Sequence, residues 1–113
     1  HKLADIVEGE KAFLNPDLSV FILAERLHVS QDEVVDAVHR LHGTSFKKYI
    51  DSLRIEYSLP LLAEINYNYD NTEDLMQVAH KCGYLDTSTF EHCFNEVMQL
   101  SVKQWCAVGR GGY

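Results

Sequence analysis

The chain has 113 residues, of which 46% are hydrophobic and 24% charged, a balance that suits one compact globular domain and not a disordered segment. No apolar run approaches the roughly 20 residues that a membrane-spanning helix needs, and no signal-peptide pattern opens the chain. Ten Lys and Arg face seventeen Asp and Glu, so the formal net charge is −7, the opposite sign from most nucleic-acid binders.

A leading helix is expected over residues 3–14, and the breaker Asn15-Pro16-Asp17 ends it. Because the first residue is His1 and not Met, we expect residues 1–14 to link this chain to an upstream region of a longer protein. The next helix begins after Ser19, whose side chain can cap its free amide groups. Its apolar positions are spaced i, i+3, i+4 and i+7, as on one face of a helix. They are Val20, Leu23, Ala24 and Leu27.

A second helix follows a short turn at His28-Val29. Ser30 stands three residues before Glu33, the arrangement of a capping box, which predicts that a helix begins here. Gly43 is suited to end this helix. Its apolar positions are Val34, Val38 and Leu41. Residues 15–45 are therefore predicted to form a helix-turn-helix unit.

A longer helix, residues 46–65, opens after Ser45 and carries apolar side chains on one face. These are Phe46, Tyr49, Ile50, Leu53, Tyr57 and Leu61. At 1.5 Å per residue, residues 46–64 would span roughly 28 Å. Pro60 removes one backbone hydrogen bond and crowds the carbonyl of Glu56, so we expect a kink or a break there. The polar segment at residues 66–71 (NYNYDN) is predicted to be a loop.

The helix-turn-helix pattern returns over residues 66–106, with a turn that is one residue longer. The positions Leu75, Ala79, Cys82 and Tyr84 repeat Val20, Ala24, Leu27 and Val29, and Asp86, Phe90 and Phe94 repeat Ser30, Val34 and Val38. Agreement of caps, turn and apolar positions together indicates an internal repeat. Residues 107–113, which contain the sequence GRGG, are predicted to be a disordered tail.

In this order, the motifs resemble the DNA-binding domain of AraC/XylS-type transcription regulators, over about residues 13–106. The matching positions of the first half are Leu18, Ala24, Leu27, Val29, Ser30, Gly43, Phe46, Tyr49, Ile50, Arg54 and Ile55. Those of the second half are Val78, Ala79, Cys82, Gly83, Tyr84, Ser88, Phe90, Phe94 and Trp105. The resemblance implies an all-α fold of two tandem helix-turn-helix subdomains, a homeodomain-like pair joined by a long linker helix. It also implies a sequence-specific DNA-binding output domain with no enzymatic activity and no cofactor.

The sequence departs from the family pattern at three places. Asn95-Glu96 stands where the family usually has a basic residue. The segment Gln99-Leu100-Ser101-Val102 replaces a Gly-x-x-Pro motif, and Pro60 falls inside the linker helix. These departures affect the surface and the helix geometry more than the core.

The resemblance makes residues 31–42 and 87–98 the recognition helices, which would enter two successive turns of the major groove of double-stranded DNA. The DNA-binding residues that it implies are Gln31, Asp36, Arg40, Thr87, Ser88, His92 and Asn95 on these helices, and Lys47, Lys48 and Arg54 on the linker helix. Asp32, Val35 and Glu91 are further outward positions.

Each of these residue types has a defined partner in DNA. Gln31 and Asn95 can read adenine, and Arg40 can reach a phosphate. Asp36 lowers the affinity unless it accepts a hydrogen bond from a cytosine amino group. The second recognition helix has no Lys or Arg, and Lys81 is a further phosphate candidate. About four phosphate contacts would give a salt slope near −3.6.

The acidic recognition helices leave a second interpretation open. In it the domain keeps the fold but serves protein–protein interaction or dimerisation, since a basic partner would complement this face. Zinc binding by His80, Cys82, His92 and Cys93 is not expected, because the adjacent His92 and Cys93 point to different faces of a helix. Three cysteines, an odd number, argue against a disulfide framework and for a reducing, cytoplasmic location.

Overall fold

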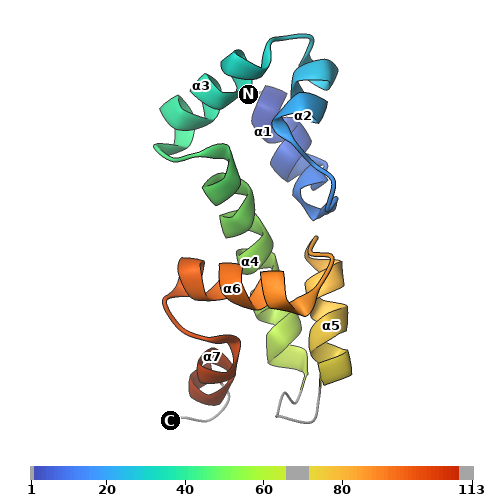
Figure 1. Cartoon of the computed structure of the whole chain (residues 1–113), viewed down its shortest axis with the longest axis vertical. Coiled ribbons are helices and arrows are strands. Elements are labelled where there is room, and N and C mark those ends of the chain that lie inside the picture. The colour runs from blue at the N-terminus through green and yellow to red at the C-terminus, as the bar shows by residue number, and fades with distance from the viewer. Residues whose placement is uncertain (1, 66–71, 110–113) are drawn as a thin grey trace. The chain divides into compact units, whose positions relative to one another are not determined.

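The computed structural model describes residues 2–65 and 72–109, and every regular element within these ranges is helical (Figure 1). The chain divides into two compact units, His1–Leu53 and Arg54–Tyr113. Each unit contains one helix-turn-helix, and the long helix α4 (Phe46–Glu64) contributes residues to both. The predicted all-α architecture is therefore confirmed. None of the helices in the described ranges is both long and apolar enough to cross a membrane.

The N-terminal segment differs from the single leading helix expected over residues 3–14. It consists of α1 (Lys2–Ala4), a π-helical turn η1 (Asp5–Gly9) and a 3₁₀ turn η2 (Ala12–Leu14). The interruption lies at Lys11, which adopts a left-handed conformation with φ of 60°. After this reversal Phe13 is buried, as are Leu3 and Val7 before it. Burial of these side chains, and not local helix propensity, thus explains the shape of the segment.

The first helix-turn-helix follows its predicted caps closely. α2 (Val20–Leu27) begins where the Ser19 hydroxyl accepts a hydrogen bond from the Ile22 amide at 3.2 Å. His28 then turns the chain in a left-handed conformation with φ of 57°. α3 (Gln31–His42) begins where the Ser30 hydroxyl accepts from the Glu33 amide at 3.1 Å. It ends at Gly43, whose φ of 66° is the left-handed conformation that glycine adopts without strain.

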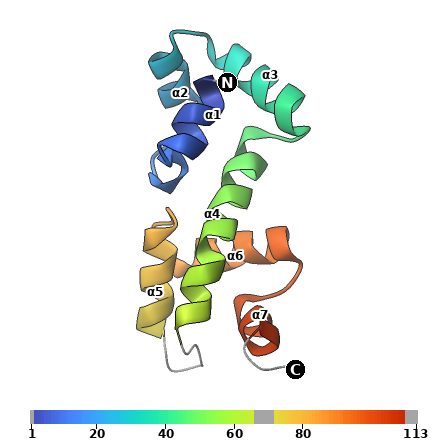
Figure 2. The same ribbon diagram turned by 180° about the vertical axis from the view of Figure 1, so that it is seen from behind.

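The core of the first unit is formed by the N-terminal segment, α2, α3 and the start of α4, and α1 lies beside α2 in both Figure 1 and Figure 2. Its residues include Leu3, Ile6, Val7, Phe13, Leu23, Ala24, Val34, Ala37, Val38, Tyr49 and Ile50. Leu41 was predicted as an apolar core position, but its side chain is 48% exposed. It lies in the last turn of α3, beyond the turns that hold the buried residues, and Ala37 is buried instead.

The long helix α4 runs unbroken through Pro60, so the break considered from the sequence does not occur. Its first turn is capped by the Ser45 hydroxyl, which accepts from the Lys48 amide at 3.2 Å. A proline inside a helix costs about 3 kcal/mol relative to alanine. Leu62, which follows Pro60 in the same helix, is fully buried in the second core, and its burial offsets part of this cost.

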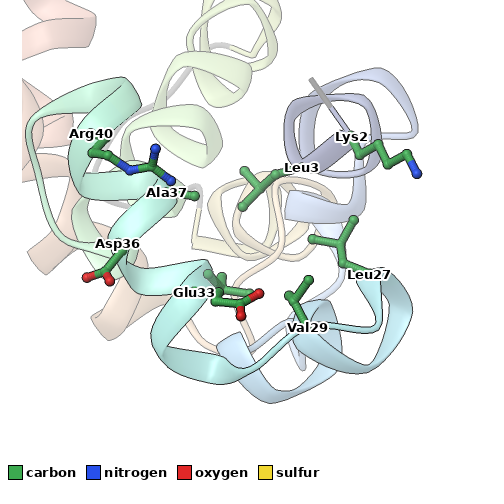
Figure 3. A pocket seen from close by; sticks show the side chains of 9 residues that line it. Lys2, Leu3, Leu27, Val29, Glu33, Asp36, Ala37 and Arg40 are labelled. Carbon is green, nitrogen blue, oxygen red and sulfur yellow. The ribbon is translucent and has the colours of Figure 1, made fainter.

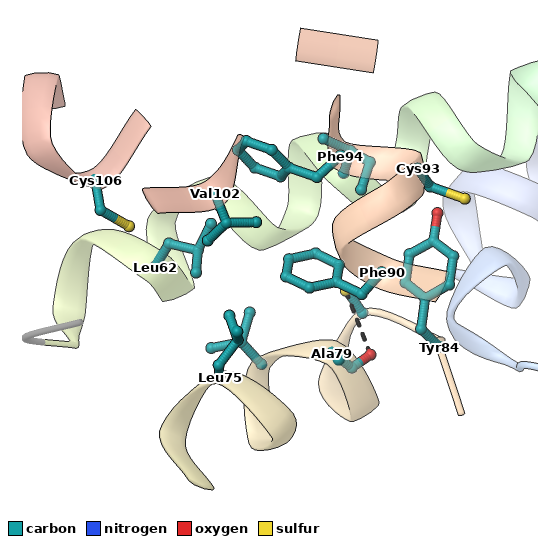
Figure 4. Packing of buried hydrophobic residues seen from close by; sticks show 12 residues of the cluster. Leu62, Leu75, Ala79, Tyr84, Phe90, Cys93, Phe94, Val102 and Cys106 are labelled. Carbon is teal, nitrogen blue, oxygen red and sulfur yellow. Dashed lines mark hydrogen bonds between the residues drawn. The ribbon is translucent and has the colours of Figure 1, made fainter. Parts of the chain in front are cut away.

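The second unit consists of the end of α4 with α5 (Thr72–Lys81), α6 (Thr87–Met98) and α7 (Val102–Gly109). Figure 4 shows buried side chains of this unit packed together. Phe90 and Phe94 are fully buried, with ring centroids 5.9 Å apart in an edge-to-face pair. Phe94 makes a similar pair with Trp105 at 6.2 Å. The predicted core positions of the repeat are all buried: Leu75, Ala79, Cys82, Tyr84, Phe90 and Phe94.

Helix α7 continues through residues 107–109, which the sequence analysis assigned to a disordered tail. Val102 and Cys106 are buried against the second core, so the helix is anchored close to its end. Residues 110–113, the rest of the predicted tail, and residues 66–71, the predicted loop, lie outside the described residues.

Candidate nucleic-acid interface

The outward face of α3 gathers the predicted site residues of the first unit. The exposed positions are Gln31, Asp32, Val35, Asp36 and Arg40. Val34, Ala37 and Val38 are buried on the other side of the same helix, so the two sets occupy opposite faces. The exposed face combines an amide, two carboxylates, an apolar side chain and a guanidinium. These are all groups that can contact base edges or phosphates.

Two lysines at the start of α4 were also predicted to contact DNA, and their surroundings differ. The Lys47 ammonium lies 2.6 Å from a carboxylate oxygen of Asp51, one helical turn later. Lys47 is 71% exposed but Asp51 only 12%, so the lysine neutralises a largely buried carboxylate. Lys48 is exposed and makes no ion pair in the described parts of the chain. Lys48 is therefore the more available of the two for a phosphate.

A buried tyrosine fixes the start of α4 within the first unit. The Tyr49 hydroxyl donates a hydrogen bond to a Glu8 carboxylate oxygen at 2.6 Å. Its ring stacks on that of His42, at the end of α3, with centroids 4.1 Å apart. Burial, followed by the hydrogen bond to Glu8, raises the pKa of Tyr49 above its ordinary value. Tyr49 thus joins the N-terminal segment, α3 and α4, and so positions Lys48 relative to the α3 face.

The outward face of α6 presents the predicted residues of the second unit. Ser88, Glu91, His92 and Asn95 are exposed, and Thr87 is partly buried. One imidazole nitrogen of His92 lies 2.7 Å from a Glu96 carboxylate oxygen. Because α6 contains no Lys or Arg, His92 is the only basic side chain on this helix that could contact a phosphate. Its ring already contacts the Glu96 carboxylate.

The start of α6 carries a charged cap, unlike that of α3. A carboxylate oxygen of Asp86 accepts a hydrogen bond from the Thr89 amide at 2.7 Å. Hydrogen bonds from Thr89 hold the pKa of Asp86 below its usual range, so the carboxylate is ionised at neutral pH. The equivalent position in the first unit is the neutral hydroxyl of Ser30. The two helices therefore differ in the charge of the cap residue itself, while acidic side chains of the first turn, Asp32 and Glu33, occur in α3 and not in α6.

Arg54, which the resemblance predicts to contact DNA, lies against an aromatic ring. Its guanidinium carbon lies 5.3 Å from the ring centroid of Tyr84, a cation–π distance, and the side chain is partly buried. Arg54 and Tyr84 belong to the second unit, whereas Lys47 and Lys48 belong to the first. Thirty residues separate the pair in the sequence, so no local pattern could have revealed the contact.

A cavity of about 660 Å³ lies beside α3 in the first unit, and no pattern in the sequence predicts it (Figure 3). Leu3, Leu27 and Val29 point into the space between the helices. The remaining lining residues are Lys2, Glu33, Val34, Asp36, Ala37 and Arg40. The cavity depends on α1 packing beside α2, a contact distant in sequence that helical periodicity does not encode.

The cysteines and histidines of the second unit do not form a metal site. No group of three His, Cys, Asp or Glu side chains could hold one ion in the ranges 2–65 and 72–109. Cys82 is fully buried, and its thiol donates to the carbonyl oxygen of Ala79 at 3.4 Å. Burial raises the pKa of the Cys82 thiol to about 12. This thiol acts as a core group and not as a ligand.

Comparison with known proteins supports the fold and defines the family. A family model described as a helix-turn-helix domain matches residues 23–107. The fold and the two capped recognition helices thus define a helix-turn-helix protein. The chain belongs to this family, as a DNA-binding domain of an AraC-type transcription regulator, and the family is not one of enzymes. A search of curated proteins found no match to the chain.

Several solved structures share the fold at low sequence identity. The C-terminal domain of the response regulator AraT from Geobacillus stearothermophilus is 22% identical with a TM-score of 0.80, covering 95% of this chain and 82% of that one. The C-terminal domain of the response regulator yesN from Fusobacterium nucleatum is 20% identical with a TM-score of 0.77, covering 93% and 94%. The DNA-binding domain of AdpA, solved with a target DNA, is 20% identical with a TM-score of 0.76, covering 94% and 90%.

Proposed function

We propose that the domain binds double-stranded DNA in the cytoplasm through the exposed face of α3, with phosphate contacts from the start of α4. The observation that carries this proposal is the exposed set Gln31, Asp36 and Arg40 on one face of α3. With it goes the exposed Lys48, which makes no ion pair within residues 2–65 and 72–109. The structural likeness to the AdpA domain, which was solved on its target DNA, supports the same use of this fold.

The exposed face of α3 would contact DNA bases through three kinds of side chain: an amide, a carboxylate and an apolar group. Gln31 offers the bidentate amide that fits the adenine edge, and Asp36 can accept from a cytosine amino group. Val35, 45% exposed between them, suits contact with a thymine methyl group. Arg40 and Lys48 would hold phosphates and fix the position of the helix on the duplex.

The second unit offers its own recognition helix. Asn95 is exposed and could read adenine, while Ser88 and the partly buried Thr87 could contact several bases. A domain that docked both α3 and α6 would read two successive turns of the major groove.

Substitution on the α3 side tests the proposal directly. Lys48→Ala and Arg40→Ala should each weaken binding of a labelled duplex by fluorescence anisotropy, by about the same factor for every sequence, because phosphate contacts are not base-specific. Lys103→Ala on α7 removes an equal charge from an exposed position of another helix and serves as the control. Equal affinities for all three variants and the wild type would contradict the proposal.

A second candidate function is the binding of a basic protein segment, and the cavity beside α3 favours it. Its opening is lined by apolar side chains, by the carboxylates of Glu33 and Asp36 and by the cations of Lys2 and Arg40. An amphipathic segment whose Arg or Lys side chains reach the two carboxylates would fit there. An arginine-rich amphipathic peptide should then shift the methyl resonances of Val34 and Ala37. Unchanged resonances would leave DNA binding as the sole candidate.

A further inference from the structure

The cavity beside α3 carries an anionic and a cationic side chain two helical turns apart. Glu33 and Arg40 both line it, with Ala37 between them on the same face of the helix. In Figure 3 the Arg40 guanidinium points toward Ala37. The Glu33 carboxylate points toward Val29. Neither charged side chain makes an ion pair anywhere in the described residues, so both are available to a ligand.

The surface between these two charges is apolar. Leu3, Leu27 and Val29 point into the space, whereas the charged ends of Lys2 and Asp36 point away from it in Figure 3. The volume of about 660 Å³ lies within the range of roughly 300–1,000 Å³ that is typical of sites for small ligands. The cavity therefore suits a small ligand with an apolar body and a charge of each sign.

The spacing of the two charges defines the ligand further. Glu33 and Arg40 are seven residues apart, which corresponds to about 10 Å along the axis of α3 at 1.5 Å per residue. An extended peptide of three residues spans roughly the same distance between its ends. A free peptide also carries an ammonium group at one end and a carboxylate at the other, so each end would meet the opposite charge.

We propose that this cavity binds a short apolar peptide, about three residues long, with free and ionised ends. Arg40 binds its carboxylate, and Glu33 binds its ammonium group. Occupancy also opposes DNA binding, because Arg40 cannot hold a ligand carboxylate and a DNA phosphate at the same time. This second part of the inference rests on the proposed function.

Titration of the domain with the tripeptide leucyl-alanyl-leucine, followed by NMR, tests the site without DNA. The methyl resonances of Leu3, Leu27 and Ala37 should shift, whereas those of Val78 in the second core should not. The same tripeptide with an acetylated amino end and an amidated carboxyl end should bind about fivefold more weakly or worse, since both charges are lost. Equal affinity of the blocked peptide, or unchanged resonances at millimolar peptide, would overturn the proposal.

Substitutions that remove one charge identify the partner of each end. Glu33→Gln should weaken binding of the free peptide about two- to fivefold but leave binding of the acetylated peptide unchanged. Arg40→Gln should do the same for the free and the amidated peptide. Asp17→Asn and Lys103→Ala remove exposed charges outside the cavity and serve as controls. Equal losses for free and blocked peptides would contradict the assigned contacts, and circular dichroism verifies that each variant is folded.

Fluorescence anisotropy of a labelled random duplex measures the competition with DNA. Saturating peptide should weaken DNA binding by about the same factor as Arg40→Ala, and it should weaken DNA binding by that variant little further. Unchanged DNA affinity with the cavity occupied would overturn the competition. Absence of DNA binding by the wild type at low salt, with peptide binding intact, would overturn the proposed function and the competition but not the peptide site.

Discussion

Asp86 shows how one residue combines a structural and an electrostatic role. Its carboxylate caps α6 through the Thr89 amide, and hydrogen bonds from Thr89 lower its pKa in the folded state. Because the pKa is lowered, the ionised carboxylate stabilises the folded state at pH values above the ordinary pKa of an aspartate. It is lost as the pH falls through the lower, folded-state pKa. Loss of this charged cap should therefore lower the stability of the second unit as the pH falls.

Replacement of this carboxylate should change the acid sensitivity of the domain. We expect the free energy of unfolding of Asp86→Asn to fall less than that of the wild type between about pH 5 and pH 2, because the amide caps the helix but does not titrate. Urea unfolding at several pH values measures the difference. Asp17→Asn, an exposed aspartate outside any helix cap, is the control. Parallel pH profiles for wild type and Asp86→Asn would contradict the role given to this cap.

The thiol of Cys82 gives a second prediction for a single residue. Burial raises its pKa to about 12, and all three cysteines are buried. Because only the thiolate reacts quickly, the folded domain should resist labelling by a thiol reagent at about pH 8, whereas unfolding in urea should expose all three thiols. Labelling monitored by mass spectrometry checks this. Rapid labelling of Cys82 in the folded domain would show that the second core opens readily.

Among the elements, helices with local signals were predictable and those without them were not. The expected recognition helices, residues 31–42 and 87–98, agree in both bounds with α3 and α6, because Ser30, Gly43 and Asp86 mark the ends locally. The N-terminal segment was predicted wrongly as one helix, since its turn at Lys11 depends on packing against distant residues. The placement of Arg54 on Tyr84 and the cavity beside α3 likewise depend on contacts far apart in sequence.

Helix α4 shows the effect of a proline inside a regular element. Pro60 is exposed and lies within an unbroken helix, so its side chain contributes little burial while its missing amide weakens the helix. Pro60→Ala should therefore raise the free energy of unfolding by about 1–3 kcal/mol, measured by urea denaturation. Glu56→Ala, an exposed change one turn earlier, should alter it by less than about 0.5 kcal/mol. Destabilisation by Pro60→Ala would mean that the proline is favourable where it stands.

For the whole molecule, the formal net charge of −7 is the property that most limits DNA affinity. The resemblance suggested about four phosphate contacts, but the structure places Arg54 over Tyr84 and leaves α6 without a Lys or Arg. Arg40, Lys47 and Lys48 remain in the first unit, where Lys47 is shared with Asp51, and the exposed Lys81 remains at the end of α5. The domain should therefore bind DNA weakly and with a shallow dependence on salt.

The dependence of DNA binding on salt tests this account most directly. Fluorescence anisotropy of a labelled random duplex, titrated with the domain from low to physiological salt, gives the slope of log affinity against log salt. Three phosphate contacts predict a slope of about −2.7, and Lys48→Ala should make it shallower by about 0.9. Absence of binding even at low salt would contradict the account, and the acidic face of α3 would then be a surface for a protein.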